Sequence, residues 1–127
     1  MKVLLAINPE HVANILIGCK FYEFRKSGAK RKIDSMLIYE TAPRQKVVAE
    51  VEVLDMLEDS PEQLWLRTRE GAGISKEFYD EYFCGREVAF AYKLGRVHIF
   101  ETPKELSEFG VKAAPQSYIY IEDSQVG

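Results

Sequence analysis

Three charged side chains of both signs lie within a short stretch between residues 18 and 25. The pattern is G-x-K-x-x-E-x-R, formed by Gly18, Lys20, Glu23 and Arg25. A nucleobase edge presents amino donors beside carbonyl acceptors, so a carboxylate can accept from an exocyclic amine while a lysine or arginine donates to a ring carbonyl or a phosphate. A site for phosphate alone would not need Glu23. The residue types therefore indicate recognition of a nucleobase.

The same side chains also have a purely structural interpretation. A strand is predicted over residues 21–25, and it places Glu23 and Arg25 on one face, where they could pair with each other and with Lys20. An exposed network of this kind contributes under about 1 kcal/mol. Four fixed positions in eight residues arise often by chance, so spacing alone favours this interpretation.

The motif is predicted to begin where a helix ends. Asn8 and Pro9 supply an N-cap and a proline at the first helical position, and Gly18 offers a left-handed closing residue. Lys20 then lies at the turn between helix and strand. The apolar stripe of this helix consists of Val12, Ile15 and Leu16.

Other segments alternate or run apolar in the manner of short strands. Gly95-Arg96 fits a two-residue hairpin between two of them. Tyr39 and Thr41 lie on the same side of another, and Tyr22 or Tyr39 could stack on a base. The predicted strands are 3–7, 36–41, 47–54, 88–94, 97–101 and 117–122.

Further helices are predicted in the second half of the chain. Residues 60–63 (Ser-Pro-Glu-Gln) form a capping box, and Ser75 starts a second helix that Gly85 closes. Residues 102–105 (Thr-Pro-Lys-Glu) form another capping box, which should open a short helix ending at Gly110. The aromatic side chains here are predicted to pack in the core rather than on a ligand; they are Trp65, Phe78, Tyr79, Tyr82 and Phe83.

Short strands with irregularly inserted helices indicate an α+β fold, a small mixed β-barrel of five to seven strands. The length of 127 residues suits one domain, 1–127, in which 124–127 form a frayed tail. Such a small barrel is filled by its own side chains, so a ligand must bind at its mouth or beneath an inserted helix.

The formal net charge of −3 argues against extensive binding to duplex nucleic acid. Five of the 17 basic residues nevertheless lie in positions 25–32, which contain no acid. This run either faces an anion or is a solvated loop. No membrane span or export signal is apparent, so a cytoplasmic location is expected.

The two cysteines, Cys19 and Cys84, have no histidine or second cysteine nearby that would complete a zinc site. They are expected to be small buried or half-buried side chains. No metal or other cofactor is predicted, and the sequence makes no prediction of an oligomeric state.

Nearly the whole chain resembles the ASCH domain family of the PUA-like superfamily. The resemblance rests on the Gly18 to Arg25 motif and on Pro115-Gln116-Ser117, with weaker likeness at 4–9, 38–39 and 73–75. It implies a PUA-like barrel whose cleft binds RNA, a nucleoside or a nucleotide, in RNA metabolism or gene regulation. The implied contacts are Lys20, Tyr22, Glu23, Arg25, Tyr39, Thr41, Gln116 and Ser117.

A hydrolase is the first alternative. Some similar proteins remove an acyl group from N4-acylated cytidine, using the motif lysine with a threonine three residues later and a distant glutamate. Here Lys20 matches, but Glu23 occupies the threonine position, and a carboxylate there would stabilise the protonated lysine. Glu70 is a loose match for the distant glutamate. For ribonuclease chemistry the corresponding trio would be Lys20, Tyr39 and Ser117.

The second alternative is a protein-interaction domain. The segment between residues 55 and 87 combines helices with many acidic side chains, which could meet a partner. Docking through this surface would survive loss of the motif charges, whereas nucleoside binding would not.

Overall fold

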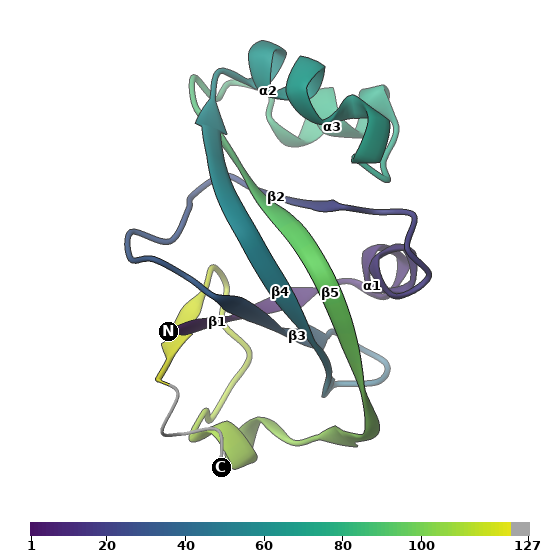
Figure 1. Cartoon of the computed structure of the whole chain (residues 1–127), viewed down its shortest axis with the longest axis vertical. Coiled ribbons are helices and arrows are strands. Elements are labelled where there is room, and N and C mark those ends of the chain that lie inside the picture. Colours follow the sequence, from purple (N-terminus) through teal and green to yellow (C-terminus); the bar gives the residue numbers. More distant parts are fainter. Residues whose placement is uncertain (123–127) are drawn as a thin grey trace.

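The computed structural model describes residues 1–122, so the tail predicted for 124–127 lies outside the described residues. The strands of this part are β1 (Lys2–Ile7), β2 (Tyr22–Arg25), β3 (Ser35–Glu40), β4 (Lys46–Asp59), β5 (Ala89–Lys104) and β6 (Ile119–Ile121). The α-helices are α1 (Pro9–Leu16), α2 (Pro61–Thr68) and α3 (Lys76–Tyr82), as drawn in Figure 1.

Within residues 1–122 the strands form one six-stranded sheet in the order β2-β5-β4-β3-β1-β6. β1 and β3 are parallel, and the other neighbouring pairs are antiparallel. The predicted α+β class and strand number are therefore confirmed. The predicted closure into a barrel is not found, because β2 and β6 lie at the two ends of the sheet and do not pair with each other.

β4 and β5 are long, and they cross the whole molecule side by side (Figure 1). The hairpin predicted at Gly95-Arg96 is wrong, because both residues lie inside β5. The pairing shifts register near Val53, and a Cβ at Gly95 would lie 2.5 Å from a carboxylate oxygen of Glu52. Gly95 therefore leaves room for side chains of β4 at a bulge in the pairing and does not form a turn.

The helix predicted to start within residues 102–105 is also misplaced. β5 continues to Lys104, which pairs with Val47 of β4. The capping box lies three residues further on, where Glu105 and Glu108 cap each other's backbone around the 3₁₀ helix Leu106–Phe109. Sheet pairing therefore overrides the local cap signal.

The remaining predicted caps agree with the structure. Asn8, Ser60 and Ser75 each accept a hydrogen bond from a backbone N–H in the first turn of α1, α2 and α3. The expectation for the cysteines is wrong, because Cys19 and Cys84 are both exposed. Each lies in a loop beside a helix end, where neither side chain reaches the core.

Three apolar clusters hold the described residues together. The first lies between β1, α1 and the curved sheet, with Ile15 and Tyr92 among its fully buried members. The second lies on the other face of β1 and includes Tyr39 and Phe109. The third packs α2 and α3 against β2 and β5 around Tyr79. The helices thus cover the end of the sheet at which β2 lies (Figure 1).

Among residues 1–122, no helix has both the length and the apolar character that crossing a lipid bilayer requires.

Candidate functional site

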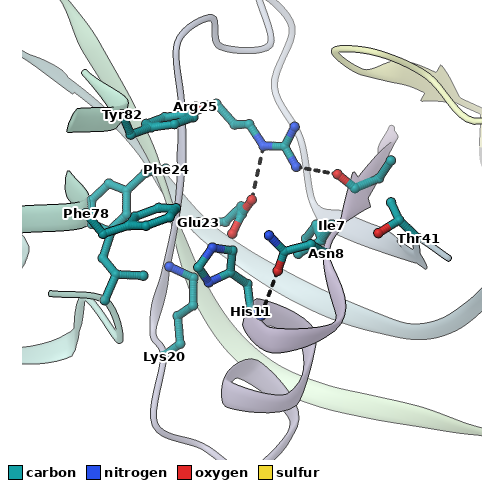
Figure 2. A pocket seen from close by; sticks show the side chains of 12 residues that line it. Ile7, Asn8, His11, Lys20, Glu23, Phe24, Arg25, Thr41, Phe78 and Tyr82 are labelled. Atoms are coloured by element: carbon teal, nitrogen blue, oxygen red, sulfur yellow. Dashed lines mark hydrogen bonds and ion pairs between the residues drawn. The ribbon is translucent and has the colours of Figure 1, made fainter. Parts of the chain in front are cut away.

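The free edge of the sheet at β2 approaches the end of β1, and a side chain bridges the two. The Nη2 atom of Arg25, on β2, donates to the carbonyl oxygen of Ala6, on β1, at 2.7 Å. A cavity of about 310 Å³ opens at this seam between β1, β2, α1 and α3. It is lined by Ala6, Ile7, Asn8, His11, Lys20, Glu23, Phe24, Arg25, Thr41, Ile74, Phe78 and Tyr82 (Figure 2).

Lys20 is held with its ammonium group inside the protein, and the residue is only 3% exposed. Its Nζ atom donates to the carbonyl oxygen of Ala72 at 3.0 Å and lies 4.9 Å from the centre of the Phe24 ring. Gly73 packs directly on the lysine, since a Cβ there would lie 2.5 Å from the Lys20 Cβ. The segment after α2 therefore fixes the lysine in place.

The position of Lys20 changes its acid–base behaviour. Burial lowers the pKa of the Lys20 ammonium below its ordinary value; the Glu23 carboxylate opposes this shift, and the Arg25 guanidinium adds to it. Desolvation penalises the charged form of a buried amine. The lysine is thus more readily deprotonated than a surface lysine, although a carboxylate is close by.

Glu23 and Arg25 form an ion pair beside the lysine. The Nε atom of Arg25 donates to Oε2 of Glu23 at 3.1 Å, and Glu23 is only 5% exposed (Figure 2). The ion pair that the structural interpretation expects is therefore present, but it joins a buried carboxylate to a half-buried guanidinium rather than two exposed groups. Lys20 donates to a backbone carbonyl in place of joining the pair. The cavity is therefore lined by one paired set of charges, Glu23 with Arg25, and by the Lys20 ammonium, which is held apart from that pair.

His11, on α1, also lines the cavity, although it was not among the predicted site residues. Burial lowers the pKa of its imidazole, and the charge of Lys20 acts in the same direction. Both effects favour the neutral form of the ring over the charged form. His11 lies three residues after the N-cap Asn8, on the helix that precedes the charged motif. A polar side chain at this position of the helix was the feature of the sequence that could have indicated a site residue.

The aromatic wall of the cavity also differs from the sequence prediction. Tyr79 and Phe83 of the α3 segment are buried, as predicted for core side chains. Phe78 and Tyr82 instead line the cavity, with ring planes 8° apart and centroids 6.5 Å apart. Helical spacing explains the division, because residues four apart share a face of α3.

The two tyrosines that the sequence offered for stacking lie elsewhere. Tyr22 is half-buried beneath the helices, with its ring 6.4 Å from that of Phe24. Tyr39 is buried in the second apolar cluster and borders a different hollow, beside Glu105 and Leu106. Neither residue lines the cavity at the seam.

The remaining predicted contacts are divided between two places. Thr41 lines the cavity, where its backbone N–H donates to the Ile7 carbonyl at 3.0 Å. Gln116 and Ser117 are exposed and lie outside the cavity lining. The Ser117 hydroxyl is 3.3 Å from that of Ser27, in the loop between β2 and β3.

The trio considered for ribonuclease chemistry is not brought together, because only Lys20 among Lys20, Tyr39 and Ser117 lines the cavity. Glu70 is exposed and does not line it. Within residues 1–122, no group of three histidine, cysteine or acidic side chains is placed to hold a metal ion.

Solved structures share this fold. A crystal structure of an ASCH protein from Zymomonas mobilis has a TM-score of 0.87 and 24% identity, covering 98% of this chain and 90% of that chain. A variant of that protein with tyrosine changed to phenylalanine has a TM-score of 0.88 and 23% identity, covering 98% and 92%. At this level of identity the likeness establishes the fold.

The curated proteins that this chain matches are longer than it is, and their names differ from those of the similar solved structures. The ATP synthase subunit alpha of Ureaplasma parvum serovar 3 is 27% identical over 121 residues, which are 94% of this chain and 15% of that protein. The large ribosomal subunit protein uL22 of the same organism is 28% identical over 99 residues, 78% of this chain and 32% of that protein. The chain thus spans less than a third of either relative. No protein-family profile matches it.

Proposed function

We propose that this protein, which has the fold of an ASCH domain, binds a nucleobase of RNA or of a nucleotide in the cavity between β1 and β2. The observation that carries the proposal is the buried set of charges of both signs around one cavity. Lys20 and Glu23 are each desolvated and each held by a second group. Burial of a charged side chain lowers the stability of the fold. The presence of two such side chains at one cavity therefore supports a ligand that they bind.

The donors and acceptors match a nucleobase edge. Oε2 of Glu23 accepts a hydrogen bond from Arg25, and the other carboxylate oxygen can accept from an exocyclic amine. The Lys20 ammonium has three protons, of which one is used by Ala72, so it can donate to a ring carbonyl. A guest with an amine and a carbonyl on one edge satisfies both groups.

The size and walls of the cavity suit a flat guest. Its volume of about 310 Å³ is at the small end of ligand sites, which span roughly 300–1,000 Å³. Phe78 and Tyr82 give it an aromatic wall, and Phe78 is 45% exposed. Base stacking on such rings contributes about 1–3 kcal/mol per base.

Titration of the four common nucleosides and of short single-stranded RNAs tests the proposal. We expect Lys20→Met to weaken the best-bound nucleoside by about tenfold or more, because a hydrogen bond from a charged donor contributes about 1.5–3 kcal/mol. Lys93→Met, at an exposed site on β5, is the matched control and should bind as the wild type does. Equal affinities of wild type and Lys20→Met for every ligand would refute the site.

Hydrolysis of N4-acylated cytidine is the second candidate function, and one observation favours it. Burial lowers the pKa of Lys20, which increases the fraction of the neutral amine that can act as a base or nucleophile. Binding of a partner protein through the acidic helices has no comparable support, because it would leave the charged side chains of the cavity without a ligand.

The hydrolase hypothesis predicts that the rate of hydrolysis of N4-acylated cytidine increases with pH. Because the reactive form of Lys20 is deprotonated, the rate should rise as pH approaches the lowered pKa from below and then level off. N4-acetylcytidine and a mixed RNA pool are incubated with the protein, and products are identified by mass spectrometry. Lys20→Arg, which stays protonated, should abolish turnover. Absence of product at high protein concentration would leave binding as the function.

A further inference from the structure

The loop between β2 and β3 carries a run of exposed cations. Lys26, Lys30, Arg31 and Lys32 are all exposed, and positions 25–32 contain no acidic residue. None of the four forms an ion pair with another of residues 1–122, whereas cations such as Lys76 and Arg67 do. Charge of one sign is therefore concentrated here on a protein whose formal net charge is −3.

Two tyrosines hold the backbone of this loop against the sheet. The hydroxyl of Tyr92, on β5, accepts from the Ala29 N–H at 3.1 Å. The hydroxyl of Tyr120, on β6, accepts from the N–H groups of Lys30 and Arg31 at 2.8 and 3.2 Å. A loop that served only solubility would not need these anchors. Fixing the backbone in advance reduces the entropy lost when its side chains bind a partner.

The loop is continuous with the cavity at one end and with β6 at the other. Lys26 follows the cavity residue Arg25, and its Nζ atom lies 4.7 Å from the centre of the Tyr82 ring, which lines the cavity. At the far end, the Arg31 guanidinium lies 5.4 Å from the Tyr120 ring. Figure 1 shows the loop after β2 on the same side of the molecule as β6.

The contact between Ser27 and Ser117 extends this surface. It places Gln116 and Ser117, which the sequence analysis expected to contact RNA, beside the loop rather than in the cavity. Serine hydroxyls and glutamine amides are common contacts to phosphate and sugar oxygens. Both parts of the sequence signature are therefore explained by one extended surface.

We propose that the 26–32 loop binds the phosphates of a single-stranded RNA whose neighbouring base occupies the cavity. The inference rests on the proposed function, since it takes the cavity to be the base site. It makes a strand, rather than a free nucleoside, the ligand: the cavity supplies base recognition and the loop supplies electrostatic attraction to the backbone. Lys26, at the rim, is placed for the first phosphate beyond the bound base.

The test compares ligands of increasing length that contain the same base: a nucleoside, its 5′-monophosphate, and RNA oligomers of three and six nucleotides. Binding is measured at several salt concentrations for the wild type and for the triple variant Lys30→Gln/Arg31→Gln/Lys32→Gln. Arg67→Gln/Arg69→Gln/Lys93→Gln is the control, because it removes the same charge at exposed sites outside the loop. Thermal unfolding checks that each variant is folded.

For the wild type we expect the hexanucleotide to bind at least about tenfold more tightly than the nucleoside at low salt. Each neutralised phosphate adds about −0.7 to the slope of log K against log salt for single strands. The loop variant should lose the gain with length and about 2 units of slope, with nucleoside affinity unchanged.

Two results separate the possible failures. A hexanucleotide that binds no more tightly than the nucleoside, or a control variant that loses as much as the loop variant, would overturn the loop assignment and leave the cavity proposal intact. Wild-type protein that binds neither nucleosides nor base-containing oligomers would overturn the proposed function, and the loop assignment with it.

Discussion

Glu23→Gln is expected to weaken binding of bases that carry an exocyclic amine by about 10- to 100-fold, while uridine binding stays the same or improves. The carboxylate can only accept hydrogen bonds, whereas the glutamine amide presents both a donor and an acceptor. Loss of a charged acceptor costs about 1.5–3 kcal/mol at the ligand. Titrations of cytidine, adenosine and uridine measure this change in selectivity.

The Glu23→Gln variant is expected to remain folded, so its nucleoside affinities can be compared with those of the wild type. Glutamine has the shape of glutamate, and its oxygen can still accept from Arg25, whose other contact to Ala6 is unchanged. We expect the free energy of unfolding to fall by about 1–2 kcal/mol. Glu77→Gln, at an exposed position on α3 outside the cavity lining, removes the same charge and should bind like the wild type. A parallel loss for all nucleosides would contradict a base-reading role for Glu23.

Gly73→Ala is expected to lower the free energy of unfolding by about 2–4 kcal/mol and to reduce nucleoside binding together with it. Gly73 has φ +69°, and an added Cβ would lie 2.5 Å from Cβ and 2.8 Å from Cα of Lys20. Relief of that clash must move either the Lys20 backbone or the segment that contains Ala72 and Gly73. Either shift would disturb the hydrogen bond from the ammonium group to the Ala72 carbonyl. Chemical denaturation and the nucleoside titration measure the two effects.

Gly85→Ala is the matched control for this substitution. Gly85 has a similar φ of +79°, but nothing lies within 4 Å of its added Cβ. It should show only the conformational cost of a left-handed residue, about 1–2 kcal/mol, with binding unchanged. If both glycine variants lost stability equally and kept their affinity, contact with Gly73 would not be what positions Lys20.

The charged residues that line the cavity could be grouped from the sequence because they are local. Lys20, Glu23 and Arg25 lie within six positions, and the cap at Asn8 and the left-handed Gly18 mark the helix that precedes them. A four-residue strand then carries two of the charges on one face. Local signals of this kind depend on backbone preferences of a few residues, which the sequence states directly.

Other features depended on partners distant in the chain. Gly95 looked like a turn residue, but the pairing of β5 with β4 makes it part of a continuous strand. Tyr39 looked available for stacking on a base, but its side chain packs in the second apolar cluster. Periodicity reports which residues share a face, and it does not report what covers that face.

The sequence by itself determined the α+β class, the N-caps of α1, α2 and α3 and the charged motif, because each follows from residue type and spacing. Only the tertiary structure decided that Arg25 bridges to Ala6, that Phe78 and Tyr82 wall the cavity, and that Ser117 lies beside the 26–32 loop. Arg25 and Ala6 lie 19 residues apart on the chain, and Ser27 and Ser117 lie 90 apart. These contacts, and the placement of α3 beside the cavity, depend on the packing of the whole sheet rather than on any local preference.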